Sequence, residues 1–202
     1  GHAAYNVANA LTAAAAAAAL GLPVDAIRAG LEGFKSENAD NPGRGNLYSV
    51  DGARVLVDFA HHVHGIDAVV RTVKAFPARR RLLMFGQAGH RSDAELAAIT
   101  DAALKLDPER IVLTDSEHYR RGREPMAVPR RLRELCVDRG VDPARISLHA
   151  SPLEGVEACL AWAGDGDACL LLTLGDRDRI AELLHSREAE SRPAGSTAGA
   201  GP

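Results

Sequence analysis

From residue 44 to residue 187, short apolar runs alternate with amphipathic stretches of helical length, and this alternation restricts the possible folds most. Apolar runs predict strands at 46–50, 53–59, 80–86, 110–115, 145–150 and 167–175, and a turn at Asp51-Gly52 joins the first two. The stretches between them predict helices at 64–76, 92–106, 126–140, 152–164 and 176–186, of which the second begins with a capping box of Ser92 and Glu95. Strands that alternate with helices form βαβ units, so we predict an α/β, Rossmann-like fold: a mostly parallel sheet with helices on both faces.

The two ends of the chain differ from this central region. Residues 5–20 are rich in alanine and predict a helix that Gly21 ends, and a second helix follows Pro23 and ends near Gly33. These helices have little bulk to build a core alone, so we expect them to pack on another part of the protein. Composition predicts a linker at 36–43 and a disordered tail at 188–202.

Composition excludes several classes of function. The formal net charge is −3, which gives no basic face for nucleic acid or a membrane surface. The run LTAAAAAAALGL is too short to span a bilayer, and no signal peptide is visible. The cysteines Cys136, Cys159 and Cys169 form no CxxC pair, which indicates reduced core residues of a cytoplasmic protein. Because the chain does not begin with Met, we expect a fragment or a trimmed chain.

The stretch VLVDFAHHVHG, residues 55–65, leaves three interpretations open. Asp58 with His61, His62 and His64 could hold a metal ion, but residues this close in a turn point in different directions. They could be turn residues with one helix cap. The third interpretation is favoured: an acid at the end of a central strand is placed to accept hydrogen bonds from ribose hydroxyls, and a nearby imidazole can line a base.

Two further loops follow predicted strand ends, where open α/β sheets bind ligands. GQAGHR, residues 86–91, is a plain strand–helix turn by default, although it precedes a helix whose amide groups could face an anion. HYRRGRE, residues 118–124, is a solvated basic loop by default, and its arginines suit a carboxylate or a phosphate. No Walker A motif occurs in the chain.

The order of several motifs resembles the carboxy-terminal part of the Mur ligase family, most closely its cyanophycin synthetase members. The motifs run in order from residue 5 to residue 125: YNVANALTAAAAAAALGLPVDAIRAGL, PGRGNLY, VLVDFAHHVHGIDAV, MFGQAGHRSDAEL and HYRRGREP. The resemblance implies an ATP-dependent ligase that activates a carboxylate as an acyl phosphate, which an amine then attacks. It also implies that residues 1–35 are a helical remnant of a central ATPase domain, and that 44–187 form the carboxy-terminal Rossmann-like domain.

The resemblance also implies roles for individual residues. Asn6 would lie beside the adenine, Arg44 would reach the ribose and phosphates, and Asp58 and His61 would bind the ribose and line the base pocket. The basic loop with Arg121 and Arg123 corresponds to the region where relatives bind the incoming amino acid. We assign His90 and Arg91 of GQAGHR to the same substrate site, and no residue of this chain to catalysis or to a metal.

Two departures from the family pattern shape the expected function. His62 and Val63 stand where the family has Asn and Pro, which could alter the turn and weaken nucleotide binding. The P-loop is absent, so ATP and Mg²⁺ would be held mainly by the central domain, and this chain alone should not be a complete catalyst. Expected partners are ATP and an amino acid or a peptide or polymer carboxylate. A non-catalytic module that binds nucleotide or a protein is the alternative, and the sequence leaves a homo-oligomer open.

Overall fold

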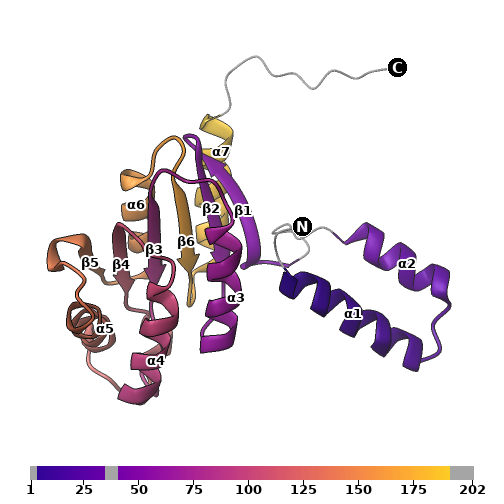
Figure 1. Cartoon of the computed structure of the whole chain (residues 1–202), viewed down its shortest axis with the longest axis horizontal. Coiled ribbons are helices and arrows are strands. Elements are labelled where there is room, and N and C mark those ends of the chain that lie inside the picture. Colours follow the sequence, from indigo (N-terminus) through magenta and orange to yellow (C-terminus); the bar gives the residue numbers. More distant parts are fainter. Residues whose placement is uncertain (1–3, 35–40, 192–202) are drawn as a thin grey trace.

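A computed structural model describes residues 4–34 and 41–191 and confirms the predicted α/β architecture (Figure 1). The strands form one six-stranded sheet in the order β1-β2-β6-β3-β4-β5. Only β1 runs antiparallel to its neighbour, and the other pairs are parallel. The strands are β1 (Arg44–Val50), β2 (Ala53–Asp58), β3 (Arg81–Phe85), β4 (Arg110–Thr114), β5 (Ile146–His149) and β6 (Ala168–Leu172).

Helices cover both faces of the sheet, as the alternation predicts. One face carries α3 (Val63–Lys74), α4 (Asp93–Leu104) and α5 (Ala127–Asp138), and the other carries α6 (Pro152–Trp162) and α7 (Arg177–Ser191). Helix α4 begins with the predicted capping box, because Ser92 and Glu95 each accept a hydrogen bond from the backbone of the other.

The core consists of two aliphatic layers that follow from the period of two along each strand. In β3, Leu83 and Phe85 face α3, α4 and α5, whereas Leu82 and Met84 face α6 and α7. The three cysteines are buried free thiols, in agreement with their assignment as core residues. Both faces of the parallel strands are therefore closed, and only the strand ends remain open to a ligand.

The β1–β2 hairpin turns at Asp51 and Gly52, as predicted, and both residues have positive φ, 50° and 79°. Strand β1 begins two residues earlier than the prediction, at Arg44, because Gly45 forms a bulge with φ 68°. This bulge sets Arg44 opposite Asp58 in the strand pair. The predicted linker at 36–43 falls mostly outside the described residues.

The predicted boundary of the disordered tail is wrong for residues 188–191, which continue helix α7. The physical reason is the edge of strand β1, whose amide groups need acceptors. Glu188 Oε1 accepts a hydrogen bond from the Ser49 amide at 2.9 Å, and Ser191 Oγ accepts one from the Asp51 amide at 3.0 Å. The rest of that tail lies outside the described residues.

Helices α1 (Ala4–Ala19) and α2 (Val24–Gly33) form a hairpin that projects away from the sheet in Figure 1. Its exposed large hydrophobic residues are Val7, Leu11, Leu20, Leu22, Val24, Leu31 and Phe34. Only the Tyr5 end of the hairpin packs against the main core. Among the described residues, no helix is both long enough and apolar enough to cross a membrane.

Candidate functional site

The candidate site is a cavity of about 290 Å³ at the carboxyl ends of the central strands. The loops after β2, β3 and β4 meet there, as expected from the parallel sheet. The cavity brings together four residues that the sequence proposed for binding: His61, His90, Arg91 and Arg121. Asp58, Arg44, Arg123 and Asn6 are not among its lining residues.

Asp58 ends β2 beneath this cavity and is only 6% exposed. Its Oδ1 accepts a hydrogen bond from the Ala60 amide at 2.7 Å, and the amides of Gly45 and Phe59 also donate to the carboxylate. Burial raises the pKa of Asp58, while these amide bonds and the charge of Arg44 oppose the rise. The carboxylate thus holds the turn after β2, and it retains lone pairs for a further donor.

Tyr5 connects the helical hairpin to this acid. Its hydroxyl lies 2.8 Å from the position that a β-carbon would take at Gly45, so the absence of a side chain there leaves room for the hydroxyl. Burial, and then the negative charge of Asp58, raise the pKa of Tyr5 to about 12. The phenol therefore stays protonated beside the carboxylate at neutral pH.

Phe59 separates the strand end from the cavity. The guanidinium groups of Arg44 and Arg177 lie 5.3 Å and 5.2 Å from the centre of its ring, within the range of cation–π attraction. Phe59 also lines the cavity. Arg44 is therefore placed against the Phe59 ring and opposite Asp58.

His61 presents one defined ring nitrogen to its surroundings. Its Nδ1 lies 3.0 Å from the carbonyl oxygen of Phe59. A carbonyl can only accept, so Nδ1 carries the proton and Nε2 remains an acceptor in the neutral ring. Because His61 lines the cavity, this nitrogen is available to a donor on a ligand.

His62 is the N-cap of helix α3, which matches the cap interpretation of the histidine cluster. Its Nδ1 accepts a hydrogen bond from the Gly65 amide at 3.1 Å. This is the bond that an Asn side-chain oxygen would make at the same place. The imidazole therefore makes the capping bond expected of the Asn that the resemblance implies here, and α3 begins at Val63 without a Pro.

We expect this cap to make stability depend on pH, because only the neutral imidazole can accept at Nδ1. Partial desolvation and the neighbouring positive charges, His61 first, lower the pKa of His62 below 6.5. The imidazole of His62 then binds a proton more readily in the unfolded state than in the folded state. The cap therefore contributes its full stability above pH 6.5, and this stability is lost as the pH falls below 6.5. The loss should be about 1 kcal/mol, the usual contribution of a cap.

Urea unfolding at pH 7.5 and pH 5.5 tests this cap, with His62→Asn as the matched variant. The amide does not titrate, so the wild type should lose more stability than the variant between these two pH values. The two proteins are otherwise identical, so the difference between them reports the contribution of residue 62. Equal losses in the two proteins would show that His62 does not cap α3 in solution.

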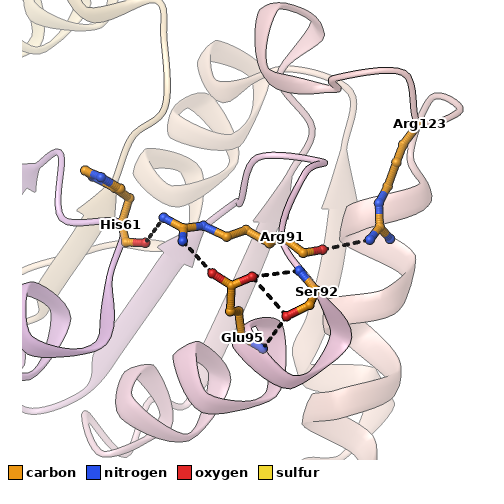
Figure 2. A network of polar contacts seen from close by, with 5 residues as sticks. All are labelled: His61, Arg91, Ser92, Glu95 and Arg123. Carbon is orange, nitrogen blue, oxygen red and sulfur yellow. Dashed lines mark hydrogen bonds and ion pairs between the residues drawn. The ribbon is translucent and has the colours of Figure 1, made fainter.

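Arg91 connects the loop after β3 to the loop after β2 (Figure 2). Its Nη1 donates to Glu95 at 2.7 Å, and its Nη2 lies 3.5 Å from the carbonyl oxygen of His61. Glu95 in turn accepts from the amide and hydroxyl of Ser92. These bonds, of which the Ser92 amide contributes most, lower the pKa of Glu95 to about 2. The side chain of Arg91 is thus fixed at the cavity wall.

Arg123, proposed from the sequence as substrate-binding, makes its contacts in this structure with the loop after β3. Its Nε donates to the carbonyl of Gly89 at 2.6 Å, and its Nη2 donates to the carbonyl of Arg91 at 2.8 Å (Figure 2). It is not among the residues that line the cavity. Its observed contacts are those of a positioning residue.

Asp115, which the sequence reasoning missed, organises the basic loop after β4. It is 4% exposed and accepts hydrogen bonds from Arg120 Nε at 2.8 Å and from the Met126 amide at 2.9 Å. The middle and the far end of the loop are therefore tied to one buried carboxylate. Its position as the last residue of a predicted strand is the signal that could have identified it.

Gln87, also missed by the sequence reasoning, lines the cavity although it is only 5% exposed. Its sole signal in the sequence is its place in the loop after β3. Arg121, by contrast, is exposed at the cavity mouth, and its guanidinium lies 5.8 Å from the centre of the Tyr119 ring. No ion pair joins Arg121 to a carboxylate of the described residues.

Asn6, which follows Tyr5 in α1, lines a different cavity. This cavity has a volume of about 550 Å³, lies between α1 and α2, and is also lined by Asn9 and Asn41. Within the described ranges, no three His, Cys, Asp or Glu side chains are arranged so that they could hold a metal ion. The structure therefore separates the proposed nucleotide residues into the hairpin, with Asn6, and the sheet, with Arg44, Asp58 and His61.

Comparison with known proteins is consistent with this geometry. Cyanophycin synthetase of Crocosphaera subtropica is 35% identical over 123 residues, which are 61% of this chain and 14% of that protein. UDP-N-acetylmuramoyl-L-alanyl-D-glutamate–2,6-diaminopimelate ligase of Geobacter metallireducens is 36% identical over 115 residues, which are 55% of this chain and 21% of that protein. The chain thus spans only 14–21% of the length of these relatives.

Two solved structures share the fold at low sequence identity. UDP-N-acetylmuramate-alanine ligase of Thermotoga maritima has a TM-score of 0.63 and 18% identity, over 94% of this chain and 39% of that one. Mycobacterium tuberculosis folylpolyglutamate synthase complexed with ADP has a TM-score of 0.55 and 17% identity, over 85% of this chain and 36% of that one. The model of the family described as Mur ligase, glutamate ligase domain, matches residues 43–175, which include every residue that lines the cavity. The chain belongs to this family.

Proposed function

We propose that residues 44–187 act as the carboxy-terminal domain of an ATP-dependent ligase that joins an amino acid to a carboxylate through an amide bond. Residues 1–35 would be the helical end of the central ATPase domain. The cavity at the sheet edge carries this proposal, because it gathers His61, His90, Arg91 and Arg121 from loops far apart in the sequence. ATP would supply the phosphoryl group that activates the carboxylate.

The nucleotide side of the proposal rests on Asp58 and Arg44. Asp58 has lone pairs left for ribose hydroxyls, and Arg44 lies opposite it in the strand pair. Asn6 would join them from the hairpin, close to the adenine. In this proposal a P-loop domain would hold Mg²⁺ and the phosphates.

The helical hairpin supports the proposed division into domains. It has no sheet of its own, and Leu11, Leu20 and Val24 are 66%, 81% and 70% exposed. Surfaces of this kind are normally covered by protein. A central domain packed there would bring its P-loop and phosphates toward the sheet edge, and closure would position nucleotide and amine for reaction.

A non-catalytic module that binds nucleotide or a protein is less well supported than the sequence suggested. Its main internal motivation was the loss of Asn and Pro after His61. Because His62 makes the capping bond that Asn would make, helix α3 begins without them.

The test compares nucleotide affinity and turnover in Asp58→Asn and the wild type. The amide oxygen can still accept from the Ala60 amide, so the turn should survive while the charge is lost. In a ligase that carries this chain after a P-loop domain, the KM for ATP should rise about tenfold, as expected for a hydrogen bond to a charged group. The 202-residue chain alone should bind ATP weakly and not hydrolyse it.

Asp67→Asn is the matched control, because Asp67 pairs with Lys105 on the surface, 2.9 Å away, and does not line the cavity. Its KM for ATP should equal that of the wild type. An unchanged KM in Asp58→Asn would remove Asp58 from the ribose site. Hydrolysis by the purified 202-residue chain would contradict the proposal that the catalytic machinery is incomplete.

A further inference from the structure

Phe59 is contacted by two arginine side chains that come from opposite ends of the domain. The guanidinium carbon of Arg44, in β1, lies 5.3 Å from the centre of the Phe59 ring. That of Arg177, the first residue of α7, lies 5.2 Å from the same point. The two groups can therefore be no farther apart than the sum of these distances, and two positive charges lie close together at the end of β2.

The backbone around Arg177 sets the position of its side chain. Its Cδ lies 3.0 Å from the place that a β-carbon would take at Gly43, so a side chain there would crowd it. Gly43 is itself fixed, because its amide donates to Asn46 Oδ1 at 2.6 Å and Asn46 is 2% exposed. The Thr173 amide, in the loop that leads to α7, donates to the Asp58 carbonyl at 3.0 Å. Arg177 is thus positioned by two anchored stretches of chain.

The positive charge of Arg177 is not balanced within the part of the chain that the structure describes. Asp58 counters the charge of Arg44, its neighbour across the strand pair. Arg177 forms no ion pair with a carboxylate of residues 4–34 and 41–191. Its side chain is exposed, so an anion from solution can reach it. The arginine pair therefore has one charge left for a ligand.

Contact with Phe59 leaves the hydrogen-bonding groups of Arg177 available. A cation–π contact uses the face of a guanidinium, whereas its N–H groups lie in the plane of the fork. Arg177 can therefore stay on the ring and still donate to an anion. Because the ring holds the fork in place before a ligand arrives, less side-chain entropy is lost on binding.

We propose that Arg177 binds the phosphate groups of the nucleotide together with Arg44, while Asp58 accepts from the ribose hydroxyls. Arginine forks bind phosphate oxygens through paired hydrogen bonds. A nucleotide joins hydroxyl donors to a phosphate chain, which suits an acceptor and two forks at one strand end. This inference rests on the proposed function, and it adds a residue beyond position 175, where the match to the family ends.

Calorimetric titration of the 202-residue chain with ATP, tripolyphosphate and adenosine tests this role, at low ionic strength and without divalent cations. Arg177→Gln should lower the affinity for ATP and for tripolyphosphate about tenfold, as expected for a hydrogen bond between charged groups, and leave that for adenosine unchanged. Arg177→Lys should recover part of the loss, because it restores the charge but not the planar fork.

Arg179→Gln is the matched control, because it removes the same charge from the same turn of α7. Arg179 is also exposed, but two residues along a helix its side chain points about 200° away from that of Arg177. Its affinities should stay within about twofold of the wild type. Equal losses in Arg177→Gln and Arg179→Gln, or no binding of tripolyphosphate by the wild type, would overturn the inference.

Asp58→Asn separates this inference from the ligase proposal on which it rests. It should weaken the binding of ATP and adenosine but not that of tripolyphosphate, which has no ribose. If Asp58→Asn leaves ATP binding unchanged while Arg177→Gln weakens tripolyphosphate binding, the ribose site fails and the phosphate role of Arg177 stands. If tripolyphosphate binding is the same in Arg177→Gln as in the wild type, the role of Arg177 fails whatever the result at Asp58.

Discussion

Gly89→Ala is expected to lower the free energy of unfolding by about 3 kcal/mol, the upper part of the usual range for overpacking. A β-carbon at Gly89 would meet the backbone carbonyl oxygen of Arg120 and would lie 2.7 Å from its carbonyl carbon. Backbone atoms cannot move aside as a flexible side chain can. The loop after β4 would have to separate from the loop after β3.

This separation would also break the polar contacts that hold the two loops together. The Gly89 amide donates to the Tyr119 carbonyl at 2.8 Å, and Arg123 donates to the Gly89 carbonyl at 2.6 Å. Because Tyr119 and Arg121 line the cavity from the same loop, binding there should weaken together with stability.

Urea unfolding of Gly89→Ala and Gly164→Ala measures the effect against a matched control. A β-carbon at Gly164 would have only Asp167 Oδ2 as a neighbour, 4.0 Å away, so that variant should stay within about 0.5 kcal/mol of the wild type. A similar unfolding midpoint for the two variants would mean that the loops do not pack at Gly89 as described.

The fold was largely predictable because its determinants are local in the sequence. Alternating apolar runs defined the strands, Asp51 and Gly52 defined the hairpin, and Ser92 with Glu95 defined the start of α4. The errors arose where contacts with residues far away in the sequence determine the local structure. Helix α7 reaches Ser191 because the edge of β1 supplies amide groups, and no pattern within the tail could show that contact.

The candidate site was predictable in its location but less so in the roles of its residues. Parallel topology places the loops after β2, β3 and β4 together, so His61 and Arg121 could be expected to meet. The sequence could not show that Arg123 turns back to carbonyl groups of the neighbouring loop. Nor could it show that Gln87 is buried at the cavity.

Asp115→Ala is expected to cost about 3 kcal/mol, because it removes the buried partner of several donors at once. Asp115 accepts from Arg120 at 2.8 Å, and from the amides of Ser116 and Met126 at 2.9 Å each. The Met126 bond also holds a backbone with φ 64°, a strained conformation for a residue other than glycine. Without the carboxylate, no hydrogen bond offsets the strain of the Met126 backbone.

Asp93→Ala is the matched control for Asp115→Ala. Asp93 also pairs with an arginine, Arg131, at 3.0 Å, but its side chain is 62% exposed, so its loss should cost less than about 1 kcal/mol of stability.

Urea unfolding of both variants measures this difference in stability, and limited proteolysis within 116–125 reports whether the basic loop has become detached. Cleavage should accelerate in Asp115→Ala alone. Equal stability and equal cleavage in both variants would show that the loop is held by its contacts at Gly89 and not by Asp115. The cavity wall that carries Arg121 would then depend on the loop after β3 alone.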